Sequence, residues 1–471
     1  MKVRNPRTGE YDYELTVDAP EVVGKKAKEI RLAQKSWREY TIDQRVAVLR
    51  KWLESFTEYQ NEIAEQLAID TARKKISQVE TKGIIGLMQA WSYRAPQLYN
   101  PPAERPSASA ATVQIGQQWV PYGLVGVISP WNFPLLLALI DTIPALLAGS
   151  GVLLKPSEVT PRFMDGLEKS ITAVPELAAV LKLVRGGADA GKAVVNNADA
   201  ICFTGSVPTG KKIGVACAER FIPAFLELGG KDPAIVLEDA DLEISTDAIL
   251  RSCVGATGQA CQSLERIYVS DKIYDDFVAM LVEKAKAVTL TTNPESGQMG
   301  PLIFDKQAEK IQVHIDDAVA KGAKILAGGK VENRNGGLWC EPTVIVNVDH
   351  TMDVMTEETF GPLIPVMKFD DLEEALGLAN DSEFGLSASV FSTDKEKAME
   401  VASQIEAGAI SINDGSLTNT VYDAEKNSFK MSGINGSRMG DAGFLRFFRK
   451  KALLYQTAAP LTMAHFEESG T

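Results

Sequence analysis

The feature that most constrains the fold is the alternation of short apolar runs with amphipathic helical segments from Tyr122 onward. The runs LVGVI, GVLL, LKLV, AICF and FIPAFLE are strand-like, and helical stretches separate them at residues 134–148, 161–173 and 208–220. Strands that alternate with helices of this length form βαβ units. The sequence therefore predicts an α/β fold with a parallel, doubly wound sheet.

A second series of strand-like runs begins after Gly230. It comprises AIVL, RIYV, AKILAG, TVIVNV, PVMKF, SASVF and AISI, separated by helices such as residues 274–288 and 395–405. The chain of 471 residues, 45% of them hydrophobic, is long enough for two or three domains. We therefore predict two doubly wound, Rossmann-like domains of similar size.

The first 95 residues and the two ends of the alternating region follow other patterns. Residues 1–95 carry Ala, Glu, Lys and Leu at helical spacing, with little that indicates strands. A proline-rich segment at residues 95–106 ends these helices, and the alternation in TVQIGQQWV predicts an extended strand. The final segment, QTAAPLTMAHFEESGT, is expected to be loosely ordered.

Charge and cysteine content exclude several classes of protein. The net charge of -13 gives no general attraction to nucleic acid or anionic membranes, so we expect neither as a partner. The N-terminus has no apolar segment or cleavage site of a secretory signal, which predicts a cytoplasmic protein. The five cysteines include no CxxC pair, so neither a disulfide framework nor a metal site is expected.

Two strand-end segments are candidates for binding a dinucleotide. CFTGSVPTGKKIG follows a strand and opens a helix but lacks GxGxxG, and Lys212 stands where a P-loop needs Ser or Thr. It is either an ordinary turn or a helix N-terminus that holds a pyrophosphate beside Ser206. LLKPSE puts Lys155 and Glu158 on one turn, either to bind ribose hydroxyls or as a solvated pair.

Cys261 is the candidate nucleophile, because it lies in the small-residue segment ATGQACQSLERIYV between a helix and a strand. None of the three histidines has a catalytic context, which disfavours a Cys-His hydrolase. A thiol that adds to an aldehyde needs an oxyanion donor and a base. Asn132 in SPWNFP is a candidate donor or a helix cap, and Glu227 in FLELGGKDP is a candidate base or a solvated edge carboxylate.

Six segments together resemble the aldehyde dehydrogenase superfamily. In chain order they are PWNFP (130–134), KPSE (155–158), FTGS (203–206), ELGGKDP (227–233), GQAC (258–261) and EETFGP (357–362). The resemblance implies oxidation of an aldehyde with NAD(P). A glutamate at position 227 implies the hydrolytic, non-acylating branch rather than release of a coenzyme A thioester.

The resemblance also implies roles for particular residues. Cys261 takes the place of the nucleophile, Asn132 that of the oxyanion donor and Glu227 that of the general base. Cofactor positions fall on Trp131, Lys155, Glu158, Gly187, Phe203, Gly205, Ser206, Glu358 and Phe360. The charge of Glu158 would repel a 2′-phosphate, so NAD is expected ahead of NADP.

The family's organisation implies three units. An NAD-binding domain would comprise residues 1–106 and 122–230, and a catalytic domain would comprise residues 231–433. A bridging element that builds homodimers or homotetramers would comprise residues 107–121 and 434–471.

The substrate entrance departs from the family's pattern. The segment that usually reads PFGGxKxSG is EKNSFKMSG here, with Lys426 where an aromatic residue is common. We favour a solvated Lys426 beside Glu425, with contact to an acidic substrate as the alternative.

The helix after Asn132 carries Phe133, Leu136, Leu137 and Ile140. This stripe predicts an apolar aliphatic or aromatic aldehyde, although a helix that faces the core would have the same pattern. A non-catalytic dinucleotide-binding scaffold remains a further alternative.

Overall fold

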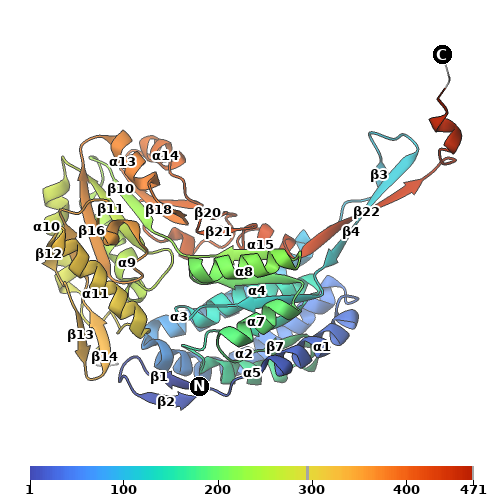
Figure 1. The fold of residues 1–471 in the computed structure, drawn as a ribbon, viewed down its shortest axis with the longest axis horizontal. Coiled ribbons are helices and arrows are strands. Elements are labelled where there is room, and N and C mark those ends of the chain that lie inside the picture. Colours follow the sequence, from blue (N-terminus) through green and yellow to red (C-terminus); the bar gives the residue numbers. More distant parts are fainter. Residues whose placement is uncertain (293–295, 469–471) are drawn as a thin grey trace.

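A computed structural model describes residues 1–292 and 296–468 of the chain. It contains two α/β units, each built on its own largely parallel sheet, and an arm that projects away from both (Figure 1). The predicted fold class is therefore confirmed. No helix of the described residues is both long enough and apolar enough to span a membrane.

The first sheet is doubly wound. Its strand order is β21-β9-β8-β5-β6-β7, so the chain starts in the middle at β5 and winds outward in both directions. Five of its strands are parallel and correspond to the predicted runs: β5 (Leu124–Ile128), β6 (Gly151–Lys155), β7 (Leu181–Leu183), β8 (Ala200–Thr204) and β9 (Ala224–Glu227). The short β21 (Gly433–Ile434) pairs antiparallel with β9. β5, β6 and β8 are buried along their whole length, which explains their continuous apolar sequences.

Helices cover both faces of this sheet. They are α1 (Pro20–Trp37), α2 (Ile42–Thr71), α3 (Lys74–Leu98), α4 (Pro134–Ala148), α5 (Phe163–Thr172), α6 (Pro175–Val180), α7 (Ala188–Asn197) and α8 (Val207–Glu219). Val125 and Val127 of β5 pack in the core with α2 to α5, whereas Leu124 and Ile128 pack with α1, α7 and α8. Because successive side chains of a strand point to opposite faces of the sheet, β5 contributes to two hydrophobic cores.

The N-terminus differs from the prediction of an all-helical layer. β1 (Lys2–Arg4) and β2 (Tyr11–Glu14) form an antiparallel hairpin ahead of α1. Its contacts are distant in sequence: Arg4 forms an ion pair with Asp305 at 3.0 Å, and Val3 is buried. The prediction was wrong here because these strands are stabilised by tertiary contacts and not by a local apolar pattern.

The second sheet has the order β12-β15-β16-β11-β10-β18-β19, and every neighbouring pair is parallel except β12 with β15. Its strands are β10 (Asp232–Val236), β11 (Leu264–Ser270), β12 (Lys324–Ala327), β15 (Thr343–Val346), β16 (Leu363–Phe369), β18 (Ser387–Phe391) and β19 (Ala409–Ile412). The helices of this unit are α9 (Leu242–Val254), α10 (Tyr274–Ala287), α11 (Asp305–Ala320), α12 (Asp353–Thr356), α13 (Leu372–Asn380) and α14 (Lys395–Ser403). All seven predicted runs are strands, with one hydrophobic cluster on each face.

Short elements complete this unit and its border with the first. They are the hairpin of β13 (Val331–Arg334) with β14 (Gly337–Cys340), the pair of β17 (Phe384–Gly385) with β20 (Phe429–Lys430), and the turns η1 (Gly255–Gly258) and η2 (Leu417–Asn419).

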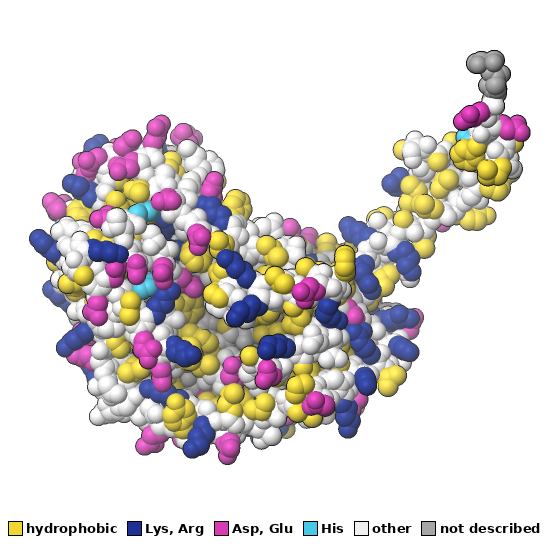
Figure 2. All heavy atoms as spheres, viewed as in Figure 1, with side chains coloured by type: hydrophobic (Ala, Val, Ile, Leu, Met, Phe, Trp, Pro, Cys, Tyr) yellow, Lys and Arg dark blue, Asp and Glu magenta, His cyan; other side chains and the backbone are white. Residues whose placement is uncertain are grey.

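The arm is a ribbon of three strands. β22 (Phe448–Gln456) pairs antiparallel along its whole length with β4 (Val113–Pro121), which also pairs with β3 (Arg105–Pro106). The turn η3 (Met463–Phe466) follows at the end of the arm. Hydrophobic side chains gather there without cover (Figure 2), and Leu454, Leu461 and Phe466 are each about 70% exposed.

The arm begins later than residue 434. Ile434 of β21 pairs with Leu226 of β9, and Phe444 in α15 (Ala442–Leu445) and Phe447 are buried in the core of the first unit. We therefore propose three units as predicted from the sequence, with residues 434–447 moved from the bridging element to the first unit.

Candidate active site

The candidate residues meet where the two units face each other. A cavity of about 110 Å³ is lined by Asn132 after β5, by Gly205 and Ser206 after β8, and by Cys261 and Glu358 of the second unit. In a doubly wound sheet the carboxyl ends of the strands form the ligand-binding edge. The structure therefore brings seven predicted site residues to one cavity: Trp131, Asn132, Gly205, Ser206, Cys261, Glu358 and Phe360.

Cys261 lies in the turn between η1 and β11 and lines two cavities at once. It is partly exposed, whereas the other four cysteines are buried. Burial raises the pKa of the Cys261 thiol to about 11, and the positive charge of Lys426 opposes that shift. The thiol is thus accessible but largely protonated at neutral pH in the protein without ligands.

The turn that carries Cys261 is held by close backbone packing. Gly258 has a φ of +68°, and a Cβ at this position would lie 2.3 Å from the backbone of Gly361. The Gln259 side chain is buried, and its Oε1 accepts a hydrogen bond from the amide of Ile303 at 2.9 Å. A glycine at 258 thus allows the GQAC and EETFGP segments to touch.

Asn132 contacts this turn directly. Its Nδ2 donates to the carbonyl oxygen of Gln259 at 3.0 Å, and the side chain is buried. It does not cap α4, because the first amides of that helix, Leu135 and Leu136, donate to Oε1 of Glu80 at 2.8 and 2.7 Å. The helix-cap interpretation of Asn132 is therefore wrong, and its amide is held beside Cys261.

Glu80 and Arg73 support Asn132 and were missed by the sequence reading. Burial raises the pKa of Glu80 to about 7, against the opposing effect of its hydrogen bonds from Leu135 and Leu136. Arg73 Nη1 donates to the carbonyl oxygen of Asn132 at 3.1 Å. Both residues belong to a helical region rich in exposed charges, so nothing in the local sequence marks them as buried.

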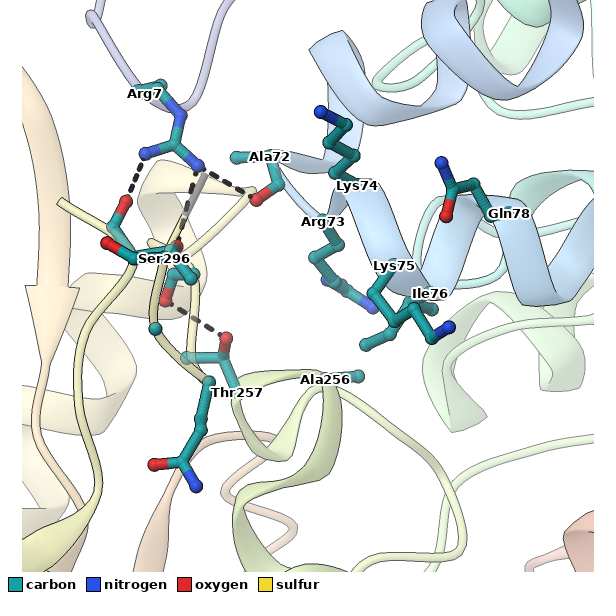
Figure 3. A pocket seen from close by; sticks show the side chains of 14 residues that line it. Arg7, Ala72, Arg73, Lys74, Lys75, Ile76, Gln78, Ala256, Thr257 and Ser296 are labelled. Atoms are coloured by element: carbon teal, nitrogen blue, oxygen red, sulfur yellow. Dashed lines mark hydrogen bonds between the residues drawn. The ribbon is translucent and has the colours of Figure 1, made fainter. Parts of the chain in front are cut away.

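A neighbouring cavity of about 350 Å³ lies beside the start of α3 and the turn at Ala256 (Figure 3). Figure 3 shows Arg73 extending from the start of α3, next to Lys74 and Lys75. Its described lining combines basic side chains with apolar and polar ones and includes no thiol and no carboxylate. This cavity therefore contains neither a candidate nucleophile nor a candidate base.

Glu227 ends β9 and lines a larger cavity of about 450 Å³ together with Cys261. Its side chain is only 14% exposed, so it is not a solvated edge carboxylate. Oε2 accepts a hydrogen bond from Ser428 at 3.2 Å, and Arg438 Nε lies 3.7 Å from Oε1. Arg438 was not predicted, because its partners Glu227 and Asp141 are distant in sequence.

Hydrophobic side chains of α4 form one wall of this larger cavity. They are Leu136, Leu137 and Ile140, and Phe133 directly before α4 lines the cavity with them, so the predicted stripe faces the cavity. Lys426 lines the same cavity, and its Nζ is buried. The favoured interpretation of Lys426 as a solvated residue is therefore wrong, because its segment folds over the cavity rather than outward.

Of the remaining cofactor candidates, Lys155, Glu158 and Gly187 lie at the ends of β6 and β7, and Phe203 lies on β8. Lys155 Nζ donates to Glu158 Oε2 at 2.9 Å, and Lys155 is buried, which excludes a fully solvated pair. A Cβ at Gly187 would lie 3.4 Å from Glu158 Oε1. The Phe203 ring packs against Gly205, where a Cβ would lie 2.5 Å away. All nine cofactor candidates thus lie along the binding edge of the first sheet or face it.

The arrangement fits a dinucleotide. α8 begins at the cavity, and its first turn has no side-chain cap, so its amides are available to an anion. Glu358 accepts a hydrogen bond from the amide of Gly230 at 3.2 Å, and burial raises its pKa to about 8. Glu265, which the sequence reading missed, holds this loop because its carboxylate accepts both the Thr359 and Phe360 amides at 2.7 Å.

Comparison with protein families gives the class. The model of the aldehyde dehydrogenase family matches residues 1–453. The chain belongs to this family and is an aldehyde dehydrogenase.

Relatives and solved structures agree with this assignment. A protein of Mycolicibacterium smegmatis named "Putative succinate-semialdehyde dehydrogenase", with NADP(+) in its name, is 33% identical over 92% of this chain and 84% of its own length. Glutarate-semialdehyde dehydrogenase of Pseudomonas putida is 34% identical over 94% and 92%. Betaine aldehyde dehydrogenase of Staphylococcus aureus, solved with NAD+, has a TM-score of 0.92 and 30% identity, covering 98% of this chain and 92% of that one. The structure named "Putative Aldehyde Dehydrogenase PutA" of Anabaena variabilis has a TM-score of 0.96 and 48% identity, covering 98% of both chains.

Removal of the Glu80 carboxylate should destabilise the protein. Glu80→Ala leaves two buried amides of α4 without an acceptor, which should cost about 3 kcal/mol in the free energy of unfolding. Glu80→Gln retains an acceptor oxygen and should cost markedly less. Urea unfolding of both variants measures this difference, and equal stabilities would contradict the capping role.

The reactivity of Cys261 should increase with pH. Because burial raises its pKa to about 11, the thiolate fraction should rise about tenfold per pH unit. The rate of alkylation by iodoacetamide, measured on the protein without cofactor between pH 7 and 9.5, should therefore rise without a plateau. Cys261→Ala is the control for the reaction of other thiols. A plateau in the rate near pH 8 would show that the pKa of the Cys261 thiol is not raised.

Proposed function

We propose that the protein oxidises an aldehyde to a carboxylic acid with NAD, through a covalent intermediate on Cys261. The observation that carries this proposal is the position of Cys261 where two cavities meet. One cavity has an apolar wall and contains Glu227, and the other contains the start of α8 and Glu358. A nucleophile at such a junction can reach a substrate on one side and a cofactor on the other.

The residues of the smaller cavity and those around Glu158 would hold the cofactor. The α8 N-terminus with Gly205 and Ser206 is suited to the pyrophosphate, and the carboxylates of Glu158 and Glu358 are suited to ribose hydroxyls. When bound, the nicotinamide dinucleotide supplies the hydride acceptor.

Three side chains would carry the covalent chemistry. The Cys261 thiolate adds to the aldehyde carbon, and the oxygen becomes an oxyanion. The Asn132 amide and the Cys261 backbone amide donate hydrogen bonds to that oxyanion. Once the carbon has been oxidised to a thioester, Glu227 accepts a proton from water, which attacks the acyl carbon and releases the acid and the thiol.

We propose NAD as the preferred cofactor. Glu158 lies next to Gly187, where its charge would oppose a 2′-phosphate. The Mycolicibacterium smegmatis relative carries NADP(+) in its name, and Lys155 contacts Glu158, which offsets part of its charge. The ratio of kcat/KM for the two cofactors decides between them, and a value that favours NADP would overturn this preference.

We propose that the substrate is a short aldehyde with a carboxylate at its other end. The relatives from Mycolicibacterium smegmatis and Pseudomonas putida are named for succinate and glutarate semialdehydes, which have this form. The apolar wall of α4 accommodates the methylene chain between the two ends. This proposal replaces the apolar aliphatic or aromatic aldehyde that the helix stripe predicted.

We also propose that the arm binds a second copy of the chain. Leu454 on the ribbon and Leu461 just beyond it are 68% and 73% exposed, which is costly in water unless they are covered. Multi-angle light scattering should give a dimer or tetramer for the protein and a smaller species for Leu454→Asp. A monomeric wild-type protein would contradict the proposal.

The enzymatic proposal is tested with a panel of aldehydes and both cofactors. The protein should reduce NAD with succinate or glutarate semialdehyde without coenzyme A, and Cys261→Ala should abolish turnover but retain NAD binding. Inactivity across the panel would favour a binding scaffold, and strict dependence on coenzyme A would favour an acylating enzyme. Turnover by Cys261→Ala would exclude the thiol as nucleophile.

Glu227→Gln should separate oxidation from hydrolysis. The first turnover should still produce a burst of NADH equal to the enzyme present, because the thiol is intact. The steady-state rate should fall by about 100-fold or more, since the water lacks its base. Stopped-flow absorbance measures both phases, and an unchanged steady state would contradict the role of Glu227.

A further inference from the structure

The larger cavity is lined by five charged side chains, four of which have partners in the protein. Those four are Glu80, bound to the amides of α4; Glu227, 3.7 Å from Arg438; Arg438, 3.2 Å from Asp141; and Arg251, 2.7 Å from Asp414. Lys426 differs from all of them. Its Nζ is buried, and among the described residues it has neither a hydrogen-bond acceptor nor an ion-pair partner.

An ammonium group in this position is unfavourable unless an anion joins it. Moving a charge from water into the protein interior without a partner has a large cost in free energy. A carboxylate placed beside the charge offsets most of that cost. Inside a cavity with an apolar wall, such a pair is also weakly screened by solvent. Lys426 therefore provides a site for one negative charge.

The backbone around Lys426 is held on two sides, so the position from which its side chain extends is fixed. The Lys426 amide donates to Ser437 Oγ at 3.1 Å, and Ser437 is buried. On the other side, a Cβ at Gly408 would lie 2.2 Å from the carbonyl oxygen of Asn427. This close contact fixes the chain immediately after Lys426.

We propose that Lys426 is the specificity-determining residue that binds the carboxylate of a short ω-oxo carboxylate substrate. The inference rests on the proposed aldehyde oxidation and adds to it the group that recognises the far end of the substrate. The methylene chain lies along Phe133, Leu136 and Leu137, and the aldehyde carbon lies at Cys261. Binding at both ends orients the carbonyl for attack. A neutral aldehyde of equal length has no carboxylate and lacks this second contact.

Steady-state kinetics with matched substrates test the charge preference. Lys426→Met keeps the length of the side chain and removes its charge. We expect kcat/KM for succinate semialdehyde to fall by roughly 10- to 100-fold, mainly through KM, while kcat/KM for butanal stays within about threefold. Lys426→Arg should retain most of the preference for the acidic substrate.

Lys430→Met is the matched control, because it removes a positive charge from the same segment. Lys430 is exposed, pairs with Glu406 at 2.7 Å and does not line the cavity. It should leave the preference between the two aldehydes unchanged. Lys426→Gln serves as a second neutral variant if Lys426→Met does not fold, with circular dichroism as the check.

Alkylation of Cys261 provides a readout that does not depend on turnover. Iodoacetate carries a carboxylate and iodoacetamide does not, and both react with the same thiol. The ratio of their rates at one pH should fall about tenfold in Lys426→Met relative to the wild type and Lys430→Met. The ratio also cancels any effect of Lys426 on the ionisation of the thiol, because that affects both reagents equally.

The outcomes separate this inference from the proposed function. If the wild type oxidises neither aldehyde, the proposed function fails, and the alkylation ratio still decides whether Lys426 attracts a carboxylate. If the wild type is active but Lys426→Met slows both aldehydes equally, or leaves the alkylation ratio unchanged, the specificity role is overturned. Loss of activity toward the acidic aldehyde alone, together with a lower ratio, supports it.

Discussion

The hydrogen bond from the Asn132 amide to the carbonyl of Gln259 joins the two halves of the site. Asn132 follows a strand of the first sheet, and Gln259 lies in the turn that presents Cys261 from the second unit. Each side has its own support, from Glu80 and Arg73 on one and from Gly258 against Gly361 on the other. Because the Cys261 thiol and the Asn132 amide come from different units, this contact brings the candidate residues together.

The chemistry of the site follows from buried charges that are paired in different ways. Glu80 is satisfied by backbone amides, and Glu265 by the loop that carries Phe360. These two carboxylates support backbone segments. Cys261 and Lys426 line the larger cavity instead, and among the described residues Lys426 Nζ has no hydrogen-bond partner.

Much of the fold was predictable because the strands of both sheets are buried on two faces. Runs such as LVGVI and AICF are continuously apolar for that reason, and both became strands. The hairpin of β1 and β2 was not predictable, because its residues are polar and its stabilising contacts, such as Arg4 with Asp305, lie far along the chain. Arg438 was also not predictable, because its partner Asp141 on α4 is distant along the chain.

The sequence alone determined the order of the strands in the two large sheets and the motif positions of Cys261, Asn132 and Glu227, since these depend on local pattern and residue type. Only the tertiary structure decided the environment of each side chain. The Nζ of Lys426 is buried at the larger cavity, and Glu80 rather than Asn132 accepts the first amides of α4. Ile434 pairs with β9, and Phe444 packs in the core of the first unit. The burial of a side chain and its hydrogen-bond or ion-pair partners depend on segments that are distant along the chain. A local sequence pattern does not show which of these segments come into contact.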